Sequence, residues 1–204
     1  MRALVAGGGG FIGSHLVDLL LGRGDEVVAI DSFVTGRRSN LSSAIGRTGF
    51  HLVEHDVTDP IPDLGDFDAV LNLASPASPD DFARFPLEIL LVGSTGTRRL
   101  LDLAGDRGSR FLQASTSEVY GDPLSHPQGE DYLGNVDPVG LRSCYDEAKR
   151  FGEAMVSAHR RVLGTDTTIA RIFNTYGERM APADGRVVAT FIAQALRGEP
   201  LSVY

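Results

Sequence analysis

The strongest constraint on the fold is a run of glycines near the amino terminus, from Gly7 to Gly13. The apolar stretch before the run reads as a buried strand, and the apolar stretch after it reads as a helix. Missing side chains let the backbone turn tightly and approach a pyrophosphate, whose charge rests on the helix N-terminus. The spacing fits G-x-G-x-x-G at Gly8, Gly10 and Gly13, and also a looser variant that begins at Gly7. Either register predicts a dinucleotide-binding α/β domain.

A second predicted strand, residues 26–30, ends in Asp31, which follows Gly10 by 21 residues. An acid at this distance from the glycine loop holds a ribose diol and repels a 2′-phosphate, so NAD is expected as the cofactor. Arg37 and Arg38 follow closely and keep NADP open as the alternative.

The rest of the chain alternates between predicted strands and helices. Further strands are predicted at 50–53, 69–73, 110–114 and 168–172, and helices at about 13–22, 86–105, 142–163 and 186–197. This alternation predicts a parallel sheet covered on both faces, which is a doubly wound α/β fold of the Rossmann type. Ligands of such sheets bind beyond the carboxyl ends of the strands. Gly7, Asp31, Ala74, Ser115 and Asn174 all fall at those ends.

Tyr145 and Lys149 stand four residues apart in a stretch with helical patterning, so they share one face of the predicted helix. The unperturbed pKa of a tyrosine is about 10, and an adjacent cation favours its charged form. The pair therefore predicts a general base, a phenol that loses its proton near neutral pH.

Composition limits the class of protein. With 204 residues and 42% hydrophobic content the chain can form one α/β domain with a sizeable core, whereas a net charge of −8 argues against a nucleic-acid partner. Cys144 is the single cysteine, which excludes an internal disulfide and fits a reducing compartment.

The chain opens directly on a strand and has no apolar stretch near the roughly 20 residues of a membrane span, so a cytoplasmic location is expected. His51 and His55 lack a third ligand at useful spacing, so no metal site is expected.

Several segments in the middle and last thirds of the chain resemble one family over essentially its whole length. They are Leu73–Pro79, Ala114–Pro123, His126–Gln128, Cys144–Arg150, Ala170–Gly177 and Asp184–Val188. These segments are similar to the UDP-glucuronate decarboxylases (UDP-xylose synthases), a branch of the extended short-chain dehydrogenase/reductase family. Members of that family continue beyond the position of Tyr204 with most of a sugar-nucleotide domain and an arginine that faces the substrate carboxylate.

The resemblance implies NAD as cofactor, a homodimer, and oxidation of the sugar at C4 followed by loss of carbon dioxide. Tyr145 would be the base and Lys149 its electrostatic partner and ribose anchor. Thr116 would donate a hydrogen bond at O4, and Ser117 with Glu118 would lie near C5 and C6. A ketone at C4 makes the substrate a β-keto acid, which readily loses carbon dioxide before hydride returns to C4.

The other implied site residues fall into two groups. Cofactor contacts are expected from Gly7, Gly10, Phe11, Ile12, Gly13, Asp31, Asp56, Val57 and Ala74, together with Tyr145 and Lys149, and substrate contacts from Asn174, Arg179, Arg186 and Tyr204. Asp31 and Asp56 have an alternative reading as helix caps or turn residues. We expect residues 1–174 to form the NAD-binding domain and residues 175–204 to begin the sugar-nucleotide region.

Three alternatives remain open. Sugar-nucleotide 4,6-dehydratases generally carry an aspartic acid where this chain has Ser117, and 4-epimerases generally lack the carboxylate of Glu118. The third alternative is a truncated protein that binds NAD without turnover. Asp80, Phe82 and Gly93 depart from the family pattern and are expected to alter the sugar pocket or the surroundings of Lys149.

Overall fold

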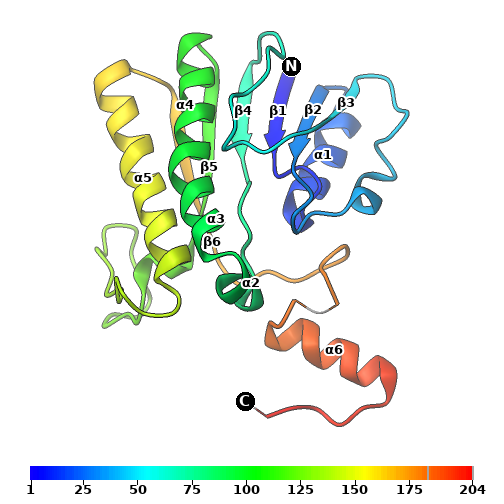
Figure 1. Ribbon diagram of the computed structural model, residues 1–204, viewed down its shortest axis with the longest axis vertical. Coiled ribbons are helices and arrows are strands. Elements are labelled where there is room, and N and C mark those ends of the chain that lie inside the picture. The colour runs from blue at the N-terminus through cyan, green and yellow to red at the C-terminus, as the bar shows by residue number, and fades with distance from the viewer. Residues whose placement is uncertain (183, 204) are drawn as a thin grey trace.

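The computed structural model describes residues 1–182 and 184–203, and at its centre lies a six-stranded sheet (Figure 1). The strands are β1 (Arg2–Ala6), β2 (Glu26–Asp31), β3 (Phe50–Glu54), β4 (Ala69–Asn72), β5 (Arg110–Thr116) and β6 (Thr167–Ile172). All neighbouring pairs are parallel, in the order β3-β2-β1-β4-β5-β6. The chain therefore moves from β1 to one edge and then crosses to the other side, which leaves a crevice between β1 and β4 at their carboxyl ends. The predicted doubly wound fold is confirmed.

Helices cover both faces of this sheet. The helices of the described residues are α1 (Phe11–Gly22), α2 (Pro79–Arg84), α3 (Pro86–Leu91), α4 (Thr97–Asp106), α5 (Ser143–Leu163) and α6 (Val187–Arg197), of which α1 lies on one face and α4 and α5 lie on the other. Alternate residues of β1 serve the two layers, because Ala3 and Val5 pack in the cluster that includes the α1 side chains, whereas Leu4 and Ala6 pack in the cluster under α4 and α5. All four are fully buried, which explains why a strand with two covered faces reads as a continuous apolar run.

The helix expected over residues 86–105 is wrong in one respect, because a π-helical segment, Val92–Gly96, separates α3 from α4. The irregular turn lies where the backbone meets its neighbours closely. A Cβ added at Gly93 would stand 2.6 Å from the Cβ of Ala148 on α5, and one at Gly96 would stand 2.9 Å from Val57 Cγ2. Sequence periodicity misses this widened turn because each half keeps a helical pattern.

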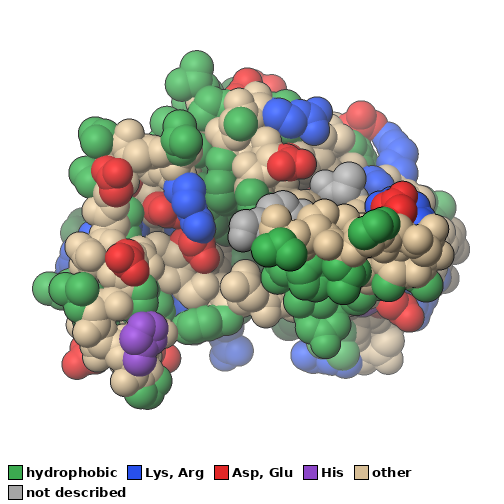
Figure 2. All heavy atoms as spheres, turned by 90° about the horizontal axis from the view of Figure 1, so that it is seen from below, with side chains coloured by type: hydrophobic (Ala, Val, Ile, Leu, Met, Phe, Trp, Pro, Cys, Tyr) green, Lys and Arg blue, Asp and Glu red, His purple; other side chains and the backbone are tan. Residues whose placement is uncertain are grey.

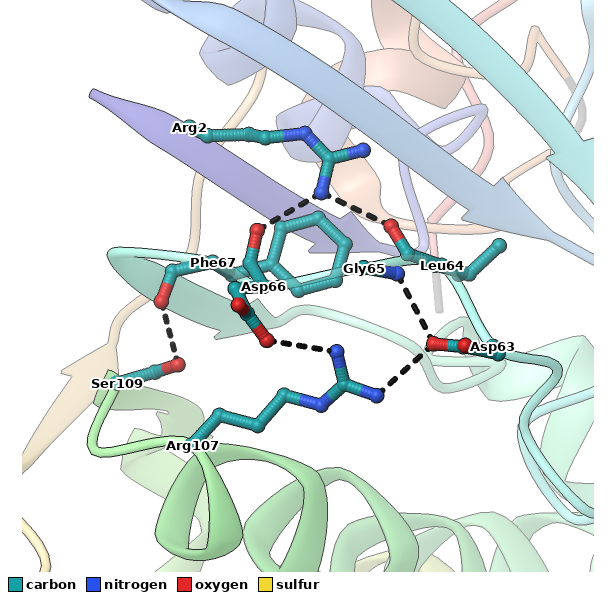
Figure 3. A network of polar contacts seen from close by, with 8 residues as sticks. All are labelled: Arg2, Asp63, Leu64, Gly65, Asp66, Phe67, Arg107 and Ser109. Atoms are coloured by element: carbon teal, nitrogen blue, oxygen red, sulfur yellow. Dashed lines mark hydrogen bonds and ion pairs between the residues drawn. The ribbon is translucent and has the colours of Figure 1, made fainter.

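Polar contacts lie at the opposite end of the sheet, where the strands begin (Figure 3). Arg2, the first residue of β1, donates to the backbone oxygens of Leu64 at 2.9 Å and Asp66 at 2.8 Å. Arg107, which follows α4, donates to the carboxylates of Asp63 and Asp66, each at 2.9 Å. The two guanidinium groups thus anchor the segment that leads into β4, far from the carboxyl ends of the strands.

Helix α6 lies apart from the sheet in Figure 1 and has no buried residue. Figure 2 shows hydrophobic side chains gathered over this part of the molecule. Val187, Ile192 and Leu196 of α6 are exposed, Leu196 to 84%. In the part of the chain that the structure describes, no helix combines the length and apolar character that crossing a bilayer would need.

Candidate active site

The glycine loop leaves an open helix N-terminus at the carboxyl end of β1. Gly7 has φ +77°, and its N–H donates to the oxygen of Ile30 at 2.9 Å. Helix α1 begins at Phe11 with no side-chain cap and no acid in its first turn, so its first N–H groups remain available to an anion. A Cβ at Gly13 would stand 2.0 Å from Gly7 O, which shows how closely helix and loop approach. This cradle fits a pyrophosphate.

Asp31 supports that loop from the end of β2. Its carboxylate accepts the N–H groups of Gly9 and Phe33, both at 2.8 Å, and burial raises its pKa against the effect of these bonds. Both arginines nearby are engaged, because Arg37 donates to the oxygen of Arg179 at 2.6 Å and Arg38 forms an ion pair with Glu54. A carboxylate at the strand end, with both basic neighbours bound elsewhere, favours a ribose diol over a 2′-phosphate.

A cavity of about 600 Å³ runs from the glycine loop to the start of α5. Its lining includes these predicted site residues: Gly7, Gly10, Phe11, Ile12, Gly13, Thr116, Ser117, Glu118, Tyr145, Lys149, Asn174, Arg179 and Arg186. The carboxyl ends of β1, β5 and β6 therefore meet at one site, as the sequence predicts.

Four other predicted cofactor residues, Asp31, Asp56, Val57 and Ala74, lie outside that lining. Asp56 accepts both the N–H and the hydroxyl of Thr58, at 2.8 and 2.7 Å, which is the turn role that the sequence left open. Val57 is buried in the core. Ala74 N donates to Asn72 Oδ1 at 3.2 Å beside the glycine loop. Tyr204, expected at the substrate, lies outside the described residues.

Tyr145 is almost fully buried and stacks on Phe82, with ring centroids 4.8 Å apart. Burial raises the pKa of this phenol, although a hydrogen bond with Thr116 acts in the opposite direction. Lys149 Nζ lies 5.6 Å from the ring centroid and donates to Ala114 O at 3.0 Å. The expectation of a phenol that ionises near neutral pH is therefore wrong for this state of the site, because its surroundings are apolar and the ammonium bonds to a carbonyl.

Burial also acts on Lys149, lowering its pKa from 10.5 to about 8. The folded protein then releases this proton at lower pH than the unfolded chain does, so Lys149 makes the free energy of unfolding rise with pH between about 8 and 10.5. Each pKa unit corresponds to about 1.4 kcal/mol. Across this window we expect the stability of the wild type, relative to Lys149→Met, to increase by about 3 kcal/mol. Urea unfolding of both proteins at several pH values measures this difference, and a difference that is constant with pH would contradict it.

Thr116, Ser117 and Glu118 form the wall next to Tyr145, where β5 passes into a short 3-10 turn, Ser117–Tyr120. Thr116 Oγ1 accepts the N–H of Glu118 at 3.2 Å, so the turn is fixed to the strand end. The Glu118 carboxylate forms an ion pair with Arg142, the residue immediately before α5. The wall thus combines two hydroxyls, a carboxylate and a guanidinium beside the phenol.

Sequence reasoning missed Arg142, and it gave Phe82 no role beyond its departure from the family pattern. It also missed an ion pair behind the wall, in which Arg171 on β6 holds Glu153 on α5 through two bonds of 2.9 and 2.8 Å. Glu153 in turn accepts the hydroxyl of Ser115 at 2.6 Å. The available signal was Arg171, the single charged residue of the predicted strand, because a charge inside a sheet requires a partner.

The chain is similar to a known family over nearly its whole length. Residues 3–204 match the model of the NAD dependent epimerase/dehydratase family. UDP-glucuronic acid decarboxylase 1 of Arabidopsis thaliana is 52% identical over 204 residues, which are the whole of this chain and 46% of that protein. The chain therefore spans about half the length of this curated relative.

The fold is also similar to solved structures over essentially the whole chain. A dTDP-glucose 4,6-dehydratase from Streptomyces venezuelae, with NAD and TYD bound, has a TM-score of 0.87 and 31% identity, covering 98% of this chain and 64% of that one. A UDP-glucose 4-epimerase from Thermotoga maritima, with UDP-glucose, has a TM-score of 0.89 and 30% identity, covering 100% of this chain and 66% of that one.

Proposed function

Because the chain belongs to the NAD dependent epimerase/dehydratase family, we propose that its protein uses NAD to convert UDP-glucuronate to UDP-xylose through a UDP-4-keto intermediate. One observation carries this proposal. The phenol of Tyr145, the hydroxyls of Thr116 and Ser117, and the carboxylate of Glu118 face one cavity that begins at a glycine loop. The similarity to UDP-glucuronic acid decarboxylases over the whole chain supports it.

The residues present fit NAD. The uncapped N-terminus of α1 would hold the pyrophosphate, and Lys149, on the cavity lining, would reach one ribose. Asp31, which accepts the N–H of Gly9 in the glycine loop, would accept the adenine ribose hydroxyls. NAD, when bound, supplies a hydride acceptor at C4 of the sugar and later returns the hydride.

The residues of the wall provide the proton chemistry. Tyr145 accepts the O4 proton as C4 is oxidised, after the buried phenol has lost its own proton, and Lys149 supplies positive charge near it. The resulting ketone is β to the carboxylate, so the C5–C6 bond breaks and carbon dioxide leaves. Thr116 and Tyr145 donate hydrogen bonds to the enolate oxygen, and C5 then receives a proton at the side of Glu118.

Two features favour decarboxylation over the reactions of the structural neighbours. Ser117 has no acidic proton for a departing C6 hydroxyl, which a 4,6-dehydratase must protonate. Glu118 adds a carboxylate that exchange of hydride and proton at C4 does not need. The alternative of a protein that binds NAD without turnover is disfavoured because Tyr145, Thr116 and Lys149 are all present in the cavity.

Incubating the full-length protein with NAD and UDP-glucuronate in heavy water tests the proposal. We expect release of carbon dioxide and UDP-xylose, or its 4-keto precursor, with deuterium at C5. UDP-glucose, which has no carboxylate, should give no such product. UDP-galacturonate would instead establish epimerisation, and binding of NAD without any product would establish the non-catalytic alternative.

The division of labour along the chain is part of this proposal. Residues 1–174 bind NAD, and the segment 175–204 begins the sugar-nucleotide region. Asn174, Arg179 and Arg186 would face the diphosphate and base, supported by their place on the cavity wall. Arginines offer charge-assisted forks to phosphate oxygens. Arg179 has an ion pair with Asp18 and Arg186 donates to Ala77 O at 2.5 Å, so both would have to share these bonds with a ligand.

The choice of cofactor gives a separate prediction. Replacing Asp31 by alanine removes the carboxylate that would hold the ribose diol, and also two bonds to the loop, so NAD binding should weaken about tenfold or more. NADP binding should be spared or improved, because the charge that repels a 2′-phosphate is gone. Titration of both dinucleotides into wild type and variant measures this, and a wild type that prefers NADP would contradict the assignment.

A homodimer is also proposed. Leu87 and Leu91 on α3 are 70% and 51% exposed, and Phe151 on α5 is 48% exposed, so these two helices present apolar surface away from the sheet. Packing this surface against its copy would form a four-helix interface. Sedimentation of the full-length protein at micromolar concentration should show a dimer, and a monomer would contradict this assignment.

Cys144, which is free and buried, supports a cytoplasmic location.

A further inference from the structure

The Glu118–Arg142 ion pair lies on the cavity wall beside the reacting groups, and no step of the proposed decarboxylation uses the guanidinium of Arg142. We infer that Arg142 is a specificity-determining residue. When the sugar binds, the guanidinium of Arg142 gives up part of its bonding to Glu118 and bonds to the carboxylate at C6 of the sugar. This inference rests on the proposed function, because it takes the orientation of the sugar from it.

The position of Arg142 follows from the chain around it. It precedes Tyr145 by three residues at the start of α5, and its Cζ lies 5.9 Å from the centre of the Phe82 ring, on which Tyr145 stacks. Its side chain is 57% exposed, so the guanidinium is accessible to a ligand. If Thr116 and Tyr145 hold O4, then C6 is only two carbon–carbon bonds from C4 and lies against this same wall.

The charges of the wall favour a cation at this point, in addition to the arginine that the resemblance implies beyond the position of Tyr204. A sugar carboxylate placed near Glu118 would bring two negative charges together, which destabilises the complex. A guanidinium has five N–H donors in a rigid fork and can bond to two carboxylates at once. Arg142 already bonds to one of them, so a substrate carboxylate completes its bonding. A hydroxymethyl group at C6 offers no such charge.

The other arginines of the lining are differently engaged, and Arg84 lies over the Phe85 ring, with its Cζ 5.0 Å from the ring centre. Arg37 bonds to the backbone oxygen of Arg179, and Arg179 pairs with Asp18, which is not among the lining residues. Arg186 also acts on Tyr145 through its charge, but it donates to Ala77 O and pairs with Asp184 at 3.3 Å. Arg186 therefore serves as the matched control, a lining arginine that would face the diphosphate common to all UDP-sugars.

The test compares the binding of UDP-glucuronate and UDP-glucose to the full-length protein with NAD by calorimetric titration. Arg142→Gln should weaken UDP-glucuronate binding about 10- to 100-fold, the loss expected for one or two charge-assisted hydrogen bonds, and should leave UDP-glucose binding nearly unchanged. Arg186→Gln should weaken both ligands alike. Arg142→Lys should recover part of the preference, because it restores the charge without the fork. Glu118→Gln should bind UDP-glucuronate at least as tightly as the wild type, since the competing carboxylate is gone.

The inference is overturned if Arg142→Gln weakens both ligands equally, if it weakens neither, or if the selective loss appears in Arg186→Gln instead. These outcomes are independent of turnover. A wild type that prefers UDP-glucuronate through Arg142 but forms UDP-galacturonate would sustain the role of Arg142 and refute the proposed reaction. If the wild type decarboxylates UDP-glucuronate but Arg142→Gln weakens both ligands equally, the proposed reaction is sustained and the role of Arg142 is refuted.

Discussion

Replacing Tyr145 by phenylalanine in the full-length protein should lower kcat about 10²- to 10⁴-fold, the contribution typical of a positioned acid–base group. The O4 proton then has no acceptor, so oxidation at C4 cannot begin. A phenylalanine ring can keep the stack on Phe82, which has a centroid separation of 4.8 Å, so we expect the variant to fold and to bind UDP-glucuronate as the wild type does. Release of carbon dioxide measures turnover, and calorimetric titration measures binding.

Tyr132→Phe is the control, because it removes a phenol hydroxyl that bonds to Leu124 N and lies outside the cavity lining. Its turnover should stay close to that of the wild type. If Tyr145→Phe kept more than about a tenth of wild-type turnover, another group would have to be the base.

The second large effect concerns the glycine loop. Gly13→Ala would place a Cβ 2.0 Å from the backbone oxygen of Gly7, and neither helix nor loop can yield without breaking the cradle. We expect the free energy of unfolding to fall by about 3 kcal/mol or more and NAD binding to be lost. Gly22→Ala in the same helix has nothing within 4 Å of the new Cβ, so it should leave stability unchanged or raise it by up to about 1 kcal/mol.

Urea unfolding and NAD titration of both glycine variants check this contrast. Equal effects in Gly13→Ala and Gly22→Ala would show that the close approach of loop and helix is not what fixes the cradle. A stable Gly13→Ala protein that still binds NAD would place the pyrophosphate elsewhere.

Local features of the sequence were sufficient to predict the framework. The glycine run with its flanking apolar stretches predicted β1 and α1, and the alternation of strands and helices predicted the parallel sheet. The spacing of Tyr145 and Lys149 predicted one shared helix, α5, and both side chains do line the cavity. These predictions succeed because each depends on residues close together in the chain, where period and spacing determine geometry.

Features that depend on contacts between distant segments could not be predicted in this way. The π segment at Val92–Gly96 lies where α3 and α4 meet α5, and the raised pKa of Tyr145 follows from its burial, in a stack with Phe82 from α2. Arg142 is the first residue of the helix predicted over 142–163, and helical periodicity carries no information on the contact with Glu118, which only the fold creates. The sequence contains these residues but not their separations in space.

The strand order has a consequence for how the cavity can come apart. The glycine loop follows β1 in the middle of the sheet, whereas Asn174 follows β6, which forms the sheet edge and pairs with β5 alone among the described strands. Edge elements open at lower free energy than central ones. Opening at this edge would dismantle the sugar side of the cavity while the cradle at Gly7 stays intact. A partly unfolded chain would then keep its glycine cradle, and re-forming a single strand pair would restore the cavity.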